Sequence, residues 1–148
     1  SDGGRIETEG FWIAMNAKTL TPQRATDSLL ERFGTTTTTE HRLKWRPWLQ
    51  NPGTVDHVTP FALRRTDIDL FEHVTNTAYW HAVHEVAAQV PDICTAPYRA
   101  VVEYRKPIKY GEDVTIGWTR RVTDGIAEAH TALSVGEDVR AAALLRRL

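Results

Sequence analysis

The 148-residue chain has a formal net charge of −1, so it has no basic excess that would favour nucleic acid as a partner. Its 41% hydrophobic content fits one globular domain, and no apolar run reaches the roughly 20 residues that span a bilayer. The single cysteine, Cys94, excludes an internal disulfide framework and favours a reducing, cytoplasmic setting. The first residue is not Met, which indicates processing or a fragment of a longer protein.

The N-terminal third shows few regular patterns. Residues 5–16 carry apolar side chains on both faces of an alternating pattern, which predicts a strand covered on both sides. A turn at 16–19 and a short helix over 27–33 follow, and Gly34 is expected to end that helix. The threonine run 35–39 has no apolar face, so we interpret it as a linker or an exposed edge.

A denser pattern begins after residue 55. It predicts a strand over 57–65, a turn over 66–74 and a helix over about 75–90, where apolar side chains recur at helical spacing before Pro91. Short turns that contain glycine then separate strand-like segments, which favours antiparallel neighbours. These four strands are predicted over 98–104, 114–122, 126–135 and 139–148. One long helix followed by an antiparallel meander is an α+β pattern.

The predicted turn before the helix concentrates chemistry-bearing residues. Asp69 and His73 lie four residues apart, so a compact turn brings a carboxylate and an imidazole to the start of the helix. The first N–H groups of a helix carry partial positive charge, which suits an oxygen that gains electron density during attack on a thioester carbonyl. Asp69 would then serve as general base or nucleophile. The structural alternatives are an Asx-turn or helix cap for Asp69, and for His73 a polar link between turn and helix.

Residues 67–79 read Asp-Ile-Asp-Leu-Phe-Glu-His-Val-Thr-Asn-Thr-Ala-Tyr. This stretch resembles the Asp-x-Asp-x-Asn-x-His-Val-Asn-Asn-x-x-Tyr motif of acyl-acyl-carrier-protein thioesterases. Glu85 matches an acidic residue later on that helix, and Glu-Tyr-Arg-Lys at 103–106 resembles the Glu-Tyr-Arg-Arg segment of the following strand. The resemblance implies a hotdog fold, in which an antiparallel sheet wraps around a central helix.

The resemblance also implies a division of the chain. Residues 10–24 resemble the strand and turn that end the first of two hotdog repeats in that family. Residues 1–52 would then be the tail of a first repeat plus a linker, and residues 53–148 the second hotdog domain. Hotdog units normally pair, so a partner unit is expected, either within a longer chain or in a homodimer.

The family's site residues map onto this chain unevenly. Its catalytic aspartate falls on Asp69 and its histidine on His73, whereas its asparagine falls on Phe71. The glutamate and cysteine of the following strand fall on Pro107 and Ile108. The resemblance therefore implies an Asp/His pair that lacks polar partners at Phe71 and Pro107.

The function that follows is hydrolysis of fatty acyl thioesters, with acyl carrier protein as the expected partner, in fatty acid biosynthesis. Asn76, Trp80 and Val83 are expected to bind substrate, although Asn76 also fits a structural hydrogen-bonding role. No cofactor and no metal is expected. An acyl-coenzyme A thioesterase and a non-catalytic acyl-thioester-binding domain are the alternatives, and Phe71 and Pro107 favour the second of them.

Other chemistry-bearing residues have simpler interpretations. His81, His84 and Glu85 share one helix face, but the order differs from the His-Glu-x-x-His zinc motif and a solvated polar face is commoner. We interpret Cys94 as an ordinary thiol. Basic pairs at strand ends would either steer an acidic carrier protein or discourage edge-to-edge aggregation; they are Arg64-Arg65, Arg105-Lys106, Arg120-Arg121 and Arg146-Arg147.

Overall fold

The computed structural model describes residues 4–8, 10, 12–19, 21–33 and 47–148. The chain divides into two compact units, Ser1–Trp45 and Arg46–Leu148. No helix in the described part of the chain is long and apolar enough to cross a membrane.

The first unit contains one short helix and no strand among its described residues. Helix α1 spans Asp27–Phe33, which confirms the predicted helix, and the predicted turn at 16–19 is closed by Asn16, whose Oδ1 accepts the N–H groups of Lys18 and Thr19. The predicted strand over 5–16 is wrong, because its described residues make only one isolated bridge, from Met15 to Pro22. Extended chain needs a hydrogen-bonded neighbour to form a strand, and local alternation cannot supply one.

The described side chains of that segment are also not covered as predicted. Ile6 is 89% exposed and Trp12 is 83% exposed. Gly34 and the threonine run 35–39 lie outside the described residues.

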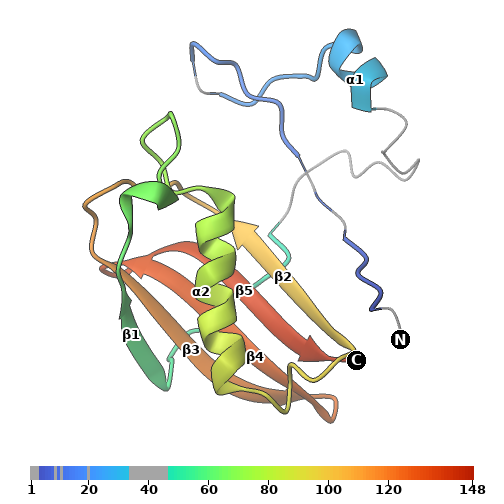
Figure 1. Cartoon of the computed structure of the whole chain (residues 1–148), viewed down its shortest axis with the longest axis vertical. Coiled ribbons are helices and arrows are strands. Elements are labelled where there is room, and N and C mark those ends of the chain that lie inside the picture. Colours follow the sequence, from blue (N-terminus) through green and yellow to red (C-terminus); the bar gives the residue numbers. More distant parts are fainter. Residues whose placement is uncertain (1–3, 9, 11, 20, 34–46) are drawn as a thin grey trace. The chain divides into compact units, whose positions relative to one another are not determined.

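The second unit is a five-stranded antiparallel sheet with one helix across one face (Figure 1). The strand order is β1-β3-β4-β5-β2, so the first and second strands in sequence form the two edges. The helix α2 spans Asn76–Gln89 and contacts the central strand β4 and its neighbour β5. The strands are β1 (His57–Phe61), β2 (Tyr98–Tyr104), β3 (Val114–Thr123), β4 (Ile126–Val135) and β5 (Asp138–Arg147). This arrangement confirms the predicted α+β hotdog fold.

Small side chains let the helix lie close to the sheet. Ala78 and Ala82 on α2 are fully buried, and so are Ala129 on β4 and Ala141 on β5. Larger apolar side chains fill the space around this contact, which removes their surface from water and stabilises the fold. The main ones are Val83, Val86, Ile93, Ile108, Ile116, Leu133 and Leu145.

The predicted strand over 57–65 is too long. Strand β1 ends at Phe61, and a single 3-10 turn, η1, spans Arg65–Asp67. Phe61 pairs with Val114, the first residue of β3, so β3 offers no further partner to residues 62–65. The chain then turns, and the Arg64 N–H donates to Asp67 Oδ2 at 2.9 Å. This local hydrogen bond closes a turn that an extended strand cannot accommodate.

A hairpin with a two-residue loop joins β3 to β4. Asp124 and Gly125 both have positive φ, 51° and 78°. Two consecutive residues with positive φ form a hairpin turn whose twist matches that of the strands it connects, and Asp-Gly is a preferred pair in such turns. The predicted turn at this position is therefore confirmed.

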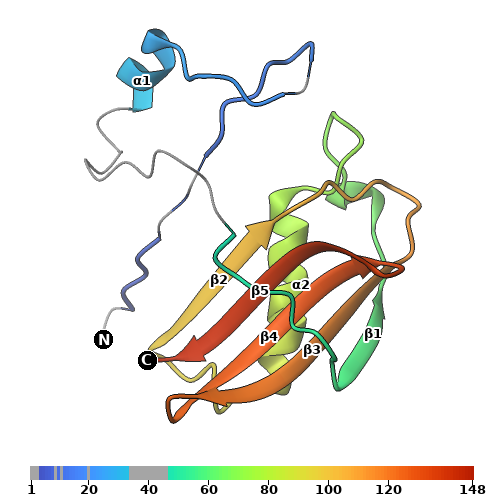
Figure 2. The same ribbon diagram turned by 180° about the vertical axis from the view of Figure 1, so that it is seen from behind.

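The face of the sheet opposite α2 is crossed by residues 47–56, which we call the strap (Figure 2). Near its start, buried Glu103 on β2 accepts the N–H groups of Trp48 and Leu49 at 2.6 and 3.2 Å. Arg105 donates to the Leu49 carbonyl at 2.6 Å and pairs with Glu103 at 3.0 Å. At its end, the Asp56 N–H donates to the carbonyl of Trp118 on β3 at 3.1 Å. The strap thus spans the sheet from one edge strand to β3.

Candidate functional site

The Asp69–His73 turn is a small loop that stands out from the start of α2. Its base is closed by an isolated antiparallel bridge between Ile68 and Val74, and the Asp69 N–H donates to the His73 carbonyl at 2.8 Å. Its tip carries two apolar side chains, with Leu70 100% and Phe71 72% exposed. The structure therefore brings the two predicted catalytic residues together at the base of one turn.

The carboxylate of Asp69 organises this turn through one of its two oxygens. Oδ1 accepts the N–H of Phe71 at 2.8 Å and the N–H of His73 at 3.1 Å, which is the Asx-turn geometry. Within the described chain, no hydrogen bond reaches Oδ2. Asp69 thus has a structural function at one oxygen and leaves the other available to a water molecule or a substrate.

The start of α2 presents unsatisfied N–H groups beside the turn. Thr75 occupies the N-cap position, and its N–H donates to the Asp67 carbonyl at 2.7 Å, but its side chain makes no capping bond. The N–H groups of Asn76 and Thr77 have no partner among the residues that the structure describes. Two donors with partial positive charge therefore remain for an oxygen from outside the chain.

A loop after β2 packs against the other side of the turn. The Val74 N–H donates to the Ile108 carbonyl at 2.8 Å, and His73 forms an isolated bridge with Lys109. The family's polar residues map onto Pro107 and Ile108. These two contacts therefore bring the segment that contains Pro107 and Ile108 beside His73. Ile108 is fully buried in the core, so this position contributes packing here and no polar group.

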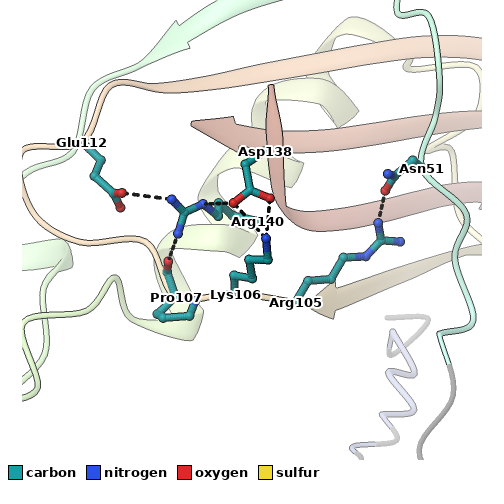
Figure 3. A network of polar contacts seen from close by, with 7 residues as sticks. All are labelled: Asn51, Arg105, Lys106, Pro107, Glu112, Asp138 and Arg140. Atoms are coloured by element: carbon teal, nitrogen blue, oxygen red, sulfur yellow. Dashed lines mark hydrogen bonds and ion pairs between the residues drawn. The ribbon is translucent and has the colours of Figure 1, made fainter. Parts of the chain in front are cut away.

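Arg140 holds this loop in place from strand β5 (Figure 3). Its Nη1 donates to the Pro107 carbonyl at 2.8 Å, its Nη2 donates to Glu112 at 3.1 Å, and its Nε lies 3.2 Å from Asp138. Lys106 also pairs with Asp138 at 2.8 Å, and that hydrogen bond holds the pKa of the Asp138 carboxyl below its ordinary value. The network fixes the loop that carries Ile108 and Lys109.

The tyrosine of the motif is a core residue. Tyr79 is 3% exposed and packs edge-on against Tyr104, with ring centroids 5.0 Å apart. Burial raises the pKa of Tyr79, against a smaller opposite effect of the Ile108 backbone N–H. Burial also raises the pKa of Tyr104, so both phenols stay protonated at neutral pH.

The three residues expected to bind substrate differ in exposure. Asn76 is exposed at the helix start, and Trp80 is 36% exposed one turn further along. Val83 is 1% exposed and lies within the core cluster. Asn76 and Trp80 are thus accessible in the described unit, whereas Val83 packs in the core on the sheet-facing side of α2.

The other chemistry-bearing residues do not form a second centre. His81, His84 and Glu85 lie on the exposed side of α2, and the His81 Nδ1 is 3.1 Å from Arg64 Nη2. Among the described residues, no three side chains of His, Cys, Asp or Glu gather into a possible metal site. Burial raises the pKa of the Cys94 thiol, which disfavours the reactive thiolate.

At least one residue of every basic pair forms an ion pair within the unit. Arg64 pairs with Asp67, Arg105 with Glu103, Arg120 with Asp92 and Arg146 with Glu128. These ion pairs reduce the positive charge that the basic pairs would present to an acidic partner.

Two ion pairs of the second unit were not predicted from the sequence. Asp67, for which no site role is expected from the sequence, is 4% exposed and bound by Arg64, and Glu103 with Arg105 fastens the strap. The Arg-x-x-Asp spacing of the first pair is a signal that points to it, because residues three apart face each other within one turn.

The antiparallel sheet wrapped around one helix defines a hotdog domain. Residues 50–145 match the family described as acyl-ACP thioesterase C-terminal domain, and the chain belongs to this family. The match covers most of the strap, the whole turn and helix α2, and nearly all of the sheet.

Two uncharacterized proteins of Mycobacterium tuberculosis, from strains CDC 1551 / Oshkosh and ATCC 25618 / H37Rv, are 62% identical over all 148 residues. The chain spans 57% of the length of each.

Two solved structures share the fold. The 12:0-ACP thioesterase from Umbellularia californica has a TM-score of 0.64 and 17% identity, over 89% of this chain and 51% of that one. A thioesterase from Thermus thermophilus, complexed with coenzyme A and Zn, has a TM-score of 0.52 and 17% identity, over 64% of this chain and 86% of that one.

Proposed function

We propose that this protein hydrolyses fatty acyl thioesters and releases free fatty acid, with acyl-acyl-carrier-protein as its substrate. The observation that carries this proposal is the placement of the open Oδ2 of Asp69 in the turn before two unpartnered N–H groups of α2. Acyl transfer to water requires a base and donors for the oxyanion, and here they occupy one turn and the helix start that follows it. Membership of the acyl-ACP thioesterase family supports the same reaction class.

In the proposed mechanism, Asp69 removes a proton from a water molecule as the water oxygen attacks the thioester carbon. The carbonyl oxygen gains negative charge and accepts hydrogen bonds from the N–H groups of Asn76 and Thr77. The carbon–sulfur bond then breaks, and the departing thiolate takes the proton that Asp69 accepted. His73 orients the substrate carbonyl or the attacking water from the opposite end of the same turn.

The proposal places the acyl chain between helix and sheet of paired hotdog units, with Asn76 and Trp80 as its accessible binding residues and buried Val83 as the packing residue behind them. Strand β2 supports pairing, because it is an edge strand with β5 as its one neighbour in the described sheet. We propose residues 1–52 as the tail of a first repeat plus a linker and residues 53–148 as the second domain, with a homodimer as the alternative pairing. The lone thiol Cys94 supports action in the reducing cytoplasm.

Hydrolysis of acyl-acyl-carrier-protein and acyl-coenzyme A by the wild type, Asp69→Asn and His73→Ala tests this proposal. We expect turnover by the wild type and a large loss in both variants, with the carrier-protein substrate preferred. Equal rates for all three proteins contradict the site assignment. A preference for coenzyme A thioesters instead supports the acyl-coenzyme A alternative.

A non-catalytic acyl-thioester-binding domain is the second candidate. Phe71 and Pro107 favour it, because the family has polar residues at both positions, and Phe71 places an exposed apolar ring at the tip of the turn. Equilibrium binding of a non-hydrolysable acyl thioester, measured beside turnover, separates the two functions. Tight binding without product release supports the binding domain.

A further inference from the structure

Arg64 and Asp67 form the most extensively bonded ion pair close to the candidate site. Asp67 is 4% exposed, and Arg64 donates to it from the backbone N–H at 2.9 Å, from Nε at 3.1 Å and from Nη2 at 2.8 Å. These hydrogen bonds hold the pKa of the Asp67 carboxyl below its ordinary value. The carboxylate is therefore charged at neutral pH and directed entirely at one arginine.

Asp67 of this pair is also linked to both ends of the Asp69–His73 turn. Asp67 lies two residues before Asp69, and its carbonyl accepts the N–H of Thr75, two residues after His73, at 2.7 Å. The turn is thus a loop whose two ends meet at Asp67. A shift of Asp67 moves both ends relative to the start of α2.

Arg64 also connects this base to the body of the helix. Its Nη2 lies 3.1 Å from Nδ1 of His81, 17 residues away in the sequence. Arginine can only donate, so His81 accepts through Nδ1 and carries its proton on Nε2. The Arg64 guanidinium therefore contacts the Asp67 carboxylate at the base of the Asp69–His73 turn and the His81 imidazole in the second helical turn of α2.

We infer that Arg64 is a positioning residue, which holds the turn carrying Asp69 in register with the free N–H groups at the start of α2. This inference rests on the proposed function, because the register matters only if Asp69 and the helix start act on one substrate. The bidentate fork of arginine suits this task, since it fixes both the distance and the plane of the carboxylate. Loss of the fork leaves Asp69 chemically intact and misplaces it.

A purely structural role of the Arg64–Asp67 pair predicts a different effect of Arg64 substitutions. If Arg64 only stabilises the fold, its replacement lowers the melting temperature and the folded fraction, while kcat per folded molecule stays unchanged. If Arg64 positions the base, kcat falls in the folded enzyme and KM changes little, because Trp80 and Asn76 are untouched. Misplacement of a reacting group by about 1 Å is enough for a loss of roughly 100-fold.

The experiment compares Arg64→Gln and Arg64→Lys with the matched control Arg65→Gln in the 148-residue chain. Arg65 belongs to the same turn, but its partner Glu72 is 67% exposed and the ion pair is 3.3 Å long. Steady-state hydrolysis of an acyl-coenzyme A and an acyl-acyl-carrier-protein is measured well below each melting temperature. Long-range ¹H–¹⁵N NMR reports the His81 tautomer in the same samples.

We expect Arg64→Gln to lower kcat by about 100-fold with KM within about 3-fold, and Arg64→Lys to recover part of the loss. Arg65→Gln keeps kcat within about 3-fold, as a solvated pair predicts. The Nε2–H tautomer of His81 dominates in the wild type and in Arg65→Gln, and the tautomer balance shifts in Arg64→Gln. A folded Arg64→Gln enzyme with wild-type kcat overturns the positioning role, while the proposed function stands. A wild type without turnover on either substrate overturns the proposed function, and the positioning role with it.

Discussion

The carboxylate of Asp69 binds the backbone N–H of His73, with Oδ1 and the nitrogen 3.1 Å apart. The two residues expected to be catalytic are therefore joined through the main chain. This contact gives Asp69 a structural and a proposed chemical role at different oxygens, and substitutions can separate the two.

Asp69→Asn and Asp69→Ala should differ in stability and agree in activity. Asn keeps an oxygen that accepts the N–H groups of Phe71 and His73, so the turn persists, whereas Ala removes the acceptor and costs about 1 kcal/mol. Both lose the base, and we expect a fall in kcat of at least about 100-fold. Urea denaturation and thioester hydrolysis measure the two effects. Retained activity in Asp69→Asn would show that the carboxylate serves the turn alone.

Phe71→Asn should raise turnover. The position carries asparagine in the resembled motif, and the 72% exposed ring leaves room for a polar side chain with a stability change within about 0.5 kcal/mol. One additional hydrogen bond of about 1 kcal/mol in the transition state raises kcat by roughly 5-fold. The matched control is Leu70→Asn, a fully exposed neighbour at the same tip. Equal increases in both variants would mean that removal of an apolar side chain is sufficient.

Asp67→Asn should destabilise the protein at neutral pH and much less in acid. Because the folded pKa of Asp67 is lowered, its contribution is complete above the unfolded value of about 3.9 and is lost as pH falls through the folded value. We expect a loss of about 2 kcal/mol at neutral pH, typical of hydrogen bonds to a charged group, when one partner is removed. Unfolding by urea at pH 7 and at steps down to pH 3 measures the difference. The exposed Asp113→Asn is the control, and a difference from wild type that grows toward low pH contradicts the assignment.

Glu103→Ala should release the start of the strap. Glu103 is 8% exposed and accepts from Trp48, Leu49 and Arg105, so its removal leaves a largely buried guanidinium unpaired and costs about 3 kcal/mol. Amide hydrogen exchange over 47–53 should accelerate more than exchange in β4. Lys106→Gln, which removes an ion pair that is about half exposed, should cost less than about 1 kcal/mol. Unchanged protection over 47–53 would show that other contacts hold the strap.

Local patterns predicted most of the second unit. The strands over 98–104 and 126–135 were confirmed to the residue, because alternation ends at turns that are themselves encoded locally. The predicted strand over 5–16 failed for the opposite reason, since a strand depends on a neighbour that the local sequence does not contain. The strand over 57–65 failed in its last residues because its partner β3 begins at Val114, opposite Phe61, and Arg64 and Asp67 then pair within a turn.

The site was predictable in part. The spacing of Asp69 and His73 predicted a turn that brings both to the helix start, and the structure has that turn. The contact between Arg64 and His81 could not be predicted, since it joins residues 17 apart through the packing of a turn on a helix. Long-range contacts of this kind depend on the assembled fold and leave no periodicity in the sequence.

The uncapped start of α2 at Thr75 has a further consequence, because the helix lacks the stabilisation that a side-chain cap would supply. The Thr75 backbone, with φ −65° and ψ 149°, already has N-cap geometry, yet its hydroxyl leaves the following N–H groups open. An Asp at this position would fill them with its own carboxylate, gain about 1 kcal/mol, and compete with any substrate oxygen for the same donors. In the proposed mechanism, stability and turnover therefore make opposite demands on this one side chain.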